Sequence, residues 1–283
     1  MRAAGTLITV APTGAESSKA DVPGLPVTLE ELVSTARACE AAGAGLVHVH
    51  VRDDDGRPTL DLARLRDTVQ ALRESTTLVV QLSTGGAVTD PLEQRLRVLD
   101  AEPDSCSLTC GTVNFGDDVF NNPWPFMVEL YRRSQAREVV PEFELFDLGH
   151  VTALNRLLDT CGEPHGGKIH CDLVMGVPGG MPGTAQALVA AVAALPAGAS
   201  WSATGIGRTT LPVALAALSA GGHLRVGLED TVTFAKGQPV EDNAQLVRRA
   251  AELGTLAQRP PMSTDEARAL LNVKDRTPAR TAG

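Results

Sequence analysis

Short β-rich runs alternate with longer helical patterns along this 283-residue chain, and this alternation constrains the fold more than any other feature. The apolar, β-branched runs predict strands over Thr6–Ala11, Gly45–Val51, Thr77–Leu82, Ser105–Thr109, Val139–Phe146, Lys168–Val174, Ser200–Thr204 and His223–Leu228. Amphipathic or alanine- and leucine-rich segments predict helices over roughly Thr28–Ala42, Leu60–Ser75, Asp90–Leu99, Pro125–Ala136, Val151–Cys161, Thr184–Leu195, Thr209–Ala220 and Glu241–Leu253. Eight strand-then-helix units predict an α/β fold of the (β/α)8 TIM-barrel type. A doubly wound open sheet is the alternative, but such a sheet usually has fewer units.

The composition favours one domain and argues against several kinds of partner. No compositional shift or flexible linker divides the chain, so we expect a single barrel domain over residues 1–283, with a polar tail from about Asp275 that frays. A net charge of −9 without a basic stripe argues against nucleic acid. No apolar run reaches ~18 residues, so we expect no membrane span, and the run near the start is too short for a signal peptide. Five scattered cysteines without a C-x-x-C pair favour reduced thiols in the cytoplasm.

Two histidines alternate with valines at the end of the second predicted strand. Side chains alternate faces along a strand, so His48, His50 and Arg52 should share one face. Two neutral imidazoles on one strand face are suitable ligands for a transition metal, most plausibly zinc. Purely structural histidines are the alternative, but a core strand gains nothing from three polar side chains on one face.

A second polar set ends the eighth predicted strand, where alternation places Arg225, Gly227 and Glu229 on one face. In a closed barrel the second and eighth strands both flank the first, so Glu229 can reach a metal held by the histidines, with Gly227 leaving room. Two histidines and one carboxylate leave open positions for substrate, as a Lewis-acidic zinc requires. The neighbouring Asp230 is then free to act as a general base. The alternative is that Glu229 and Asp230 are an exposed acidic pair at the start of a loop.

Polar and glycine-rich loops follow other predicted strands, at the barrel end where such folds place their active sites. Ser83-Thr84-Gly85-Gly86 offers backbone N–H groups that could hold a carboxylate or phosphate, and Gly205-Ile206-Gly207-Arg208 could bind phosphate. His170 and His223 lie within strand runs, and we interpret both as structural.

Five motifs together resemble the β-keto acid cleavage enzymes, the group that includes 3-keto-5-aminohexanoate cleavage enzyme. They are T-V-A-P-T-G-A-E at 9–16, V-H-V-H-V-R-D at 47–53, Q-L-S-T-G-G at 81–86, S-L-T-C-G-T-V-N-F-G at 107–116 and G-G-H-L-R-V-G-L-E-D at 221–230. The resemblance covers nearly the whole chain. It implies a zinc-dependent barrel, often a homotetramer, that condenses a β-keto acid with acetyl-CoA to give acetoacetate and a shortened acyl-CoA.

The resemblance also assigns roles to residues. It implies zinc ligation by His48, His50 and Glu229, with Asp230 as the base and Arg225 beside it. The implied substrate-contacting residues are Glu16, Ser83, Gly86 and Thr109. Glu16 hints at a substrate with a cationic group, although a local role in its loop is also possible.

The expected chemistry follows from the substrate class. A β-keto acid presents carboxylate and ketone oxygens to an open zinc, so Asp230 can remove the α-proton, and the enolate attacks the acetyl thioester. Arg225 would steady Asp230 or the developing oxyanion. A zinc-dependent aldolase or lyase without CoA is the alternative enzyme. A non-catalytic scaffold barrel is disfavoured, because the polar positions converge at one end.

Overall fold

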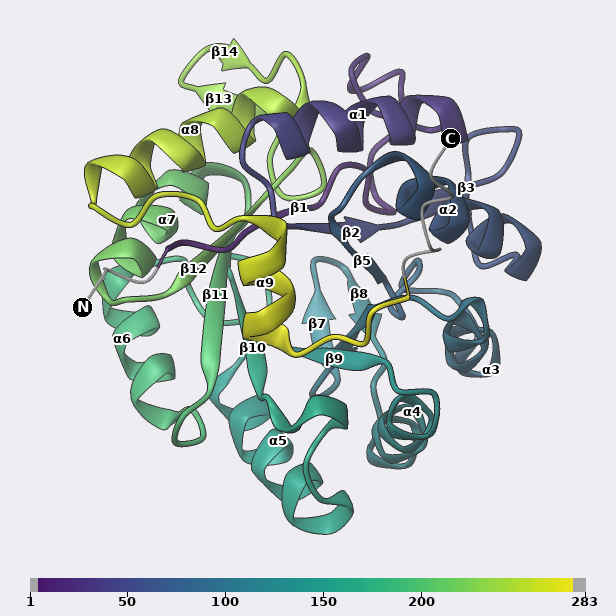
Figure 1. The fold of residues 1–283 in the computed structure, drawn as a ribbon. Helices are drawn as coiled ribbons and strands as arrows, with labels where there is room; N and C mark the ends of the chain where they lie inside the picture. The colour runs from purple at the N-terminus through teal and green to yellow at the C-terminus, as the bar shows by residue number, and fades with distance from the viewer. Residues whose placement is uncertain (1–4, 277–283) are drawn as a thin grey trace.

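A computed structural model describes residues 5–276 of the chain. Eight parallel strands close into a barrel in the order β1-β12-β11-β10-β9-β6-β5-β2 (Figure 1). Their bounds are Ile8–Val10 (β1), Leu46–Val49 (β2), Val79–Leu82 (β5), Ser105–Thr109 (β6), Val140–Leu145 (β9), His170–Met175 (β10), Ser200–Gly205 (β11) and His223–Val226 (β12). The predicted TIM-barrel fold is confirmed, and each of these strands lies in or overlaps a predicted one.

Helices surround the barrel (Figure 1). Those between or after the barrel strands are α1 (Leu29–Ala41), α2 (Leu62–Ser75), α3 (Leu92–Arg97), α4 (Trp124–Ala136), α5 (Leu148–Cys161), α6 (Ala185–Ala194), α7 (Thr210–Ser219) and α8 (Asn243–Leu256). Their starts follow ordinary capping chemistry: Thr28 and Glu31 form a reciprocal capping box at α1, and Asp242 accepts a hydrogen bond from the Gln245 N–H at α8. All eight predicted helices are therefore present. None of the helices within residues 5–276 is long and apolar enough to cross a membrane.

The sequence patterns missed three small hairpins in loops that follow barrel strands. They are β3 (Val51–Arg52) with β4 (Pro58–Thr59), β7 (Val113–Phe115) with β8 (Asp118–Phe120), and β13 (Thr233–Ala235) with β14 (Gln238–Pro239). Strands of two or three residues are too short to show an alternating pattern. The first hairpin also corrects the end of the predicted strand Gly45–Val51. Strand β2 ends at Val49, and Val51 lies with Arg52 in the hairpin strand β3.

A ninth helix, α9 (Thr264–Leu271), was also missed, and it closes the amino end of the barrel. Figure 1 shows this helix in yellow, lying across the barrel. Ala267 and Leu271 of α9 pack against Leu46 and Val79, the first residues of β2 and β5, and against Leu7, which directly precedes β1. The predicted fraying tail falls mostly on residues 277–283, outside the described part of the chain.

Candidate metal centre and active site

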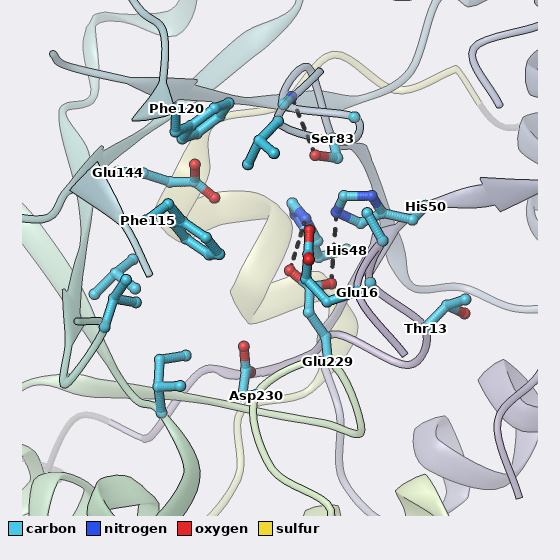
Figure 2. Close-up of a pocket in the computed structure, with 18 of the residues that line it drawn as sticks. Thr13, Glu16, His48, His50, Ser83, Phe115, Phe120, Glu144, Glu229 and Asp230 are labelled. Carbon is cyan, nitrogen blue, oxygen red and sulfur yellow. Dashed lines mark hydrogen bonds and ion pairs between the residues drawn. The ribbon is translucent and has the colours of Figure 1, made fainter. Parts of the chain in front are cut away.

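A pocket opens at the carboxyl end of the barrel, on the side opposite α9. Residues from four barrel strands and from the loops after the strands line it, and Figure 2 shows the polar groups among them converging. The sequence-predicted residues that line it are Glu16, His48, His50, Ser83, Gly86, Arg225, Glu229 and Asp230. Thr109 is the one predicted site residue that does not appear in this lining.

His48, His50 and Glu229 form a three-residue donor set (Figure 2). The Glu229 Oε1 lies 3.8 Å from His48 Nε2, and its Oε2 lies 3.6 Å from His50 Nε2. One ligand atom from each residue fits within 4.8 Å of the others, and no other group of three in residues 5–276 meets this criterion. The Glu229 Oε2 is buried and has no hydrogen-bond partner in the same part of the chain. An orphaned carboxylate oxygen beside two imidazole nitrogens fits a divalent transition metal.

Gln81 orients the first of these histidines. The Gln81 Oε1 lies 2.5 Å from His48 Nδ1, and the Gln81 side-chain N–H donates to the Ser105 Oγ at 3.1 Å. An amide oxygen only accepts, so Nδ1 carries the proton and Nε2 is left as a free donor for a metal. Burial, followed by the charge of Arg225, lowers the pKa of His48 to about 4, so the imidazole is neutral at pH 7.

Arg225 holds Asp230 in place. Its Nε donates to Asp230 Oδ2 at 3.2 Å and its Nη2 to Asp230 Oδ1 at 2.9 Å, which is a bidentate pairing. The Arg225 Nη2 also contacts Glu229. Burial raises the pKa of Asp230 to about 7, with Arg225 opposing the shift and Glu229 adding to it. A carboxyl group with such a pKa is suited to general base catalysis near neutral pH.

Glu144 of β9 also lines the pocket and was missed in the sequence. Its Oε1 accepts from Arg225 Nη1 at 3.4 Å, and its Oε2 accepts from the Thr109 hydroxyl at 2.7 Å. Thr109 thus reaches the site through Glu144. Burial raises the pKa of Glu144 despite the neighbouring Arg225. The signal was present in the sequence, because Glu142 and Glu144 alternate with Phe143 in a predicted strand, as the histidines alternate with valines.

Arg52 holds the loop after β1 and does not face the pocket. Its Nη2 donates to the carbonyl oxygens of Gly14 at 2.6 Å and Ser17 at 2.9 Å. This loop carries Glu16 into the pocket lining, and its turn at Gly14 has φ +64°. A Cβ at Gly14 would lie 2.7 Å from the Glu229 Cγ, so a side chain there would displace the candidate ligand.

The remaining predicted loop residues have mixed outcomes. Ser83 and Gly86 line the pocket, but the Ser83 Oγ already accepts the Gly85 N–H at 3.2 Å. Gly227 does not make room for Glu229 as predicted, but lets the backbone directly after β1 approach closely. A Cβ at this position would lie 1.9 Å from the Ala11 carbonyl oxygen. The Gly207 N–H donates to the Asp230 carbonyl at 2.7 Å, so this amide is not free for a phosphate.

An apolar wall faces the metal-ligand residues across the pocket, and the sequence analysis did not anticipate it. Figure 2 shows Phe115 and Phe120, from the β7–β8 hairpin, on the side away from His48 and His50. We define the apolar wall as the pocket-lining residues Val88, Phe115, Phe120, Phe146, Val174, Val177 and Ile206. Two of its aromatic residues lie on a hairpin with no strand signal, so sequence periodicity could not place them.

Comparisons with known proteins identify the family of the chain. The family model described as beta-keto acid cleavage enzyme matches residues 6–273. The chain is 37% identical to the 3-keto-5-aminohexanoate cleavage enzyme of Acetoanaerobium sticklandii, over 94% of this chain and 98% of that protein. It is 35% identical to the 3-oxoadipate:acetyl-CoA acetyltransferase of Cupriavidus necator, over 94% of each chain.

A solved structure extends the comparison at the level of the fold. The apo structure of ObcA superposes with a TM-score of 0.76 at 18% identity, over 89% of this chain and 66% of that chain. The sequence comparisons are closer, and they confirm the resemblance inferred from the five motifs. The chain belongs to the β-keto acid cleavage enzyme family.

Proposed function

We propose that this protein is a zinc-dependent acyltransferase that condenses a β-keto acid with acetyl-CoA, giving acetoacetate and the acyl-CoA of the shortened acid. The observation that best supports this proposal is that three potential metal ligands, His48, His50 and Glu229, lie beside the buried carboxyl group of Asp230, whose pKa is raised to about 7. Both relatives compared above carry names of enzymes that cleave or transfer to keto acids.

His48, His50 and Glu229 would hold the zinc. When bound there, the ion would supply a Lewis acid for the carboxylate and ketone oxygens of the keto acid, which acidifies the α-carbon. Three protein ligands leave coordination positions open, as catalytic zinc sites do. The tetrameric assembly implied by the family resemblance and the cytoplasmic location stay predictions.

Asp230 would remove the α-proton of the keto acid. Its bidentate pairing with Arg225 fixes both carboxylate oxygens, so the base is held in one orientation before substrate arrives. Glu144 and its hydrogen-bond donor Thr109 would position Arg225 from the other side. Glu16, Ser83 and Gly86, which line the pocket, are the proposed substrate contacts.

The bond changes then balance without a further reactant. The α-carbon attacks the acetyl thioester carbonyl, and CoA leaves as a thiolate. The thiolate attacks the original ketone carbon, the bond between that carbon and the α-carbon breaks, and the proton held by Asp230 returns to the α-carbon. The acetoacetate formed takes two carbons from the keto acid and two from acetyl-CoA.

The test follows the carbon atoms. The zinc-loaded protein is incubated with 3-oxohexanoate and acetyl-CoA labelled with ¹³C in both acetyl carbons, and the products are examined by NMR. We expect label at C3 and C4 of acetoacetate and none in the new butanoyl-CoA. Cleavage of the keto acid without acetyl-CoA would contradict the proposal and favour the aldolase or lyase alternative. Asp230→Asn is the matched control and should form labelled acetoacetate at least about 10²-fold more slowly.

A further inference from the structure

We propose that the keto acid taken by this enzyme carries an uncharged, apolar side chain, which the apolar wall receives. This inference rests on the proposed function and specifies its substrate. The relatives compared above are named for substrates with a charged group beyond the ketone, an amine at C5 in one and a second carboxylate in the other.

The position of the wall sets the direction of the side chain. A keto acid whose carboxylate and ketone oxygens bind a metal held by His48, His50 and Glu229 would have only its side chain left to cross the pocket. Figure 2 shows Phe115 and Phe120 on that opposite side. Phe115, Phe120 and Phe146 pack edge to face on one another, with ring centroids 6.2 to 6.5 Å apart.

The members of the wall offer no polar partner to a charged group. Figure 2 shows the Glu144 carboxylate between Phe115 and Phe120, but its oxygens already accept from Arg225 and Thr109. Val174, Val177 and Ile206 complete the wall with aliphatic side chains, and none of its members carries a side-chain hydrogen-bond donor or acceptor. A charge moved from water to such a surface loses its hydration without gaining a partner. An alkyl or aryl group gains from the same transfer in proportion to the apolar area that it buries.

At the wall itself, a cationic end also meets a positive charge. The buried Arg95 guanidinium lies behind the wall, 4.8 Å from the centroid of Phe120, and donates to neutral acceptors of Thr84, Asn121 and Asn122. Its positive charge occupies one face of the ring and repels a cation approaching the other.

An anionic end faces the opposite problem. Glu16, Glu144, Glu229 and Asp230 all line the pocket, whereas Arg225 is the lining arginine and is paired with three of these carboxyl groups. A second carboxylate on the substrate would add like charge to this set.

The test compares three acids with six-carbon chains: 3-oxohexanoate, 3-keto-5-aminohexanoate and 3-oxoadipate. Their binding to the zinc-loaded protein is measured by calorimetry without acetyl-CoA, so the result does not depend on turnover. We expect 3-oxohexanoate to bind at least about tenfold more tightly than either charged acid. Equal or tighter binding of either charged acid would overturn the inference.

A pair of variants on the β7–β8 hairpin tests whether the wall causes the preference for an uncharged side chain. Phe115→Asp places a carboxylate in the wall and should reduce the preference for 3-oxohexanoate over the amino acid analogue by about tenfold. Val119→Asp adds the same charge at a site that is 46% exposed and outside the pocket lining, so the preference should not change. An unchanged preference in Phe115→Asp, with the fold retained by circular dichroism, would overturn the role of the wall.

Binding and turnover also separate this inference from the proposed function. If 3-oxohexanoate binds most tightly but yields no acetoacetate with acetyl-CoA, the substrate inference holds and the proposed reaction fails. If labelled acetoacetate forms but a charged acid binds as well as 3-oxohexanoate, the reaction holds and the substrate inference fails.

Discussion

The two ends of the barrel are built from the same strands but differ in chemistry. At the amino end, Leu46 and Val79 begin β2 and β5 and pack against α9. Two residues later on the same strands, His48 and Gln81 contact each other near the metal-ligand set. Since side chains alternate, a step of two residues keeps the same face and moves only ~7 Å along the strand. Along these two strands the inward face therefore changes from apolar to polar within a single step, whereas β10 and β12 already begin with the buried histidines His170 and His223.

This division separates stability from chemistry. The amino end is closed by a helix and contributes apolar burial, whereas the carboxyl end carries glycine turns, buried carboxyl groups and a buried oxygen that lacks a partner. Such a site costs stability, and the apolar packing elsewhere must offset it. We therefore expect substitutions at the carboxyl end to lower activity, and substitutions at the amino end to lower the free energy of unfolding.

The largest effect on chemistry is expected from His48→Ala. Loss of one of three ligands should remove most of the bound zinc and reduce kcat/KM by about 10⁴-fold or more, because the Lewis acid is lost. Plasma emission spectroscopy measures the metal, and acetoacetate formation measures activity. His165→Ala, in the short 3₁₀ helix between α5 and β10 and outside the pocket lining, is the control. Full zinc occupancy in a His48→Ala/His50→Ala protein would show that the donor set is assigned wrongly.

Asp230→Asn should separate the metal from the base at the same end of the barrel. The amide keeps the shape and can still accept from Arg225, so zinc content should not change. Turnover should fall by about 10²- to 10⁴-fold, because an amide cannot take the α-proton. Loss of zinc in this variant would instead assign Asp230 to the metal.

Much of this contrast was predictable from sequence. The eight strands carry runs of β-branched and apolar residues, and the histidine pair is visible because polar residues interrupt such a run at a period of two. Glu144 carried the same signal and could have been found by the same rule.

Other parts depended on tertiary structure. Arg52 followed the strand pattern, but β2 stops at Val49 and the chain turns into a hairpin. The apolar wall depends on how the β7–β8 hairpin folds back over the barrel, and α9 is a short helix separated from the repeating units. The placements of Arg52 and of the wall leave no periodic signal, because long-range packing determines them. Helix α9 did carry one, since Ser263 and Glu266 form a capping box and the buried Ala267 and Leu271 are four residues apart.

Gln81 lies between the two ends of the barrel, and we expect its substitution to reduce zinc binding less than the loss of a ligand does. Gln81→Leu removes the acceptor for the His48 Nδ1–H, so zinc affinity should fall by about 10- to 100-fold. Competition with a chromophoric chelator measures this directly. Gln81→Glu keeps an oxygen acceptor at the same place and should retain most of the affinity. Equal affinities for the wild type and Gln81→Leu would show that the tautomer of His48 is fixed by other contacts.

Leu271→Ala should have the smallest effect on chemistry and a clear effect on stability. Leu271 is 2% exposed at the closed amino end, and its truncation leaves a cavity beneath α9. The free energy of unfolding in urea should fall by about 2–4 kcal/mol, while zinc affinity and kcat/KM stay at wild-type values. Leu256→Ala, at a residue that is 81% exposed, should change stability by less than about 0.5 kcal/mol. A loss of zinc affinity in Leu271→Ala would mean that packing at the amino end also positions His48, two residues beyond Leu46 on β2, and that the two ends are mechanically coupled.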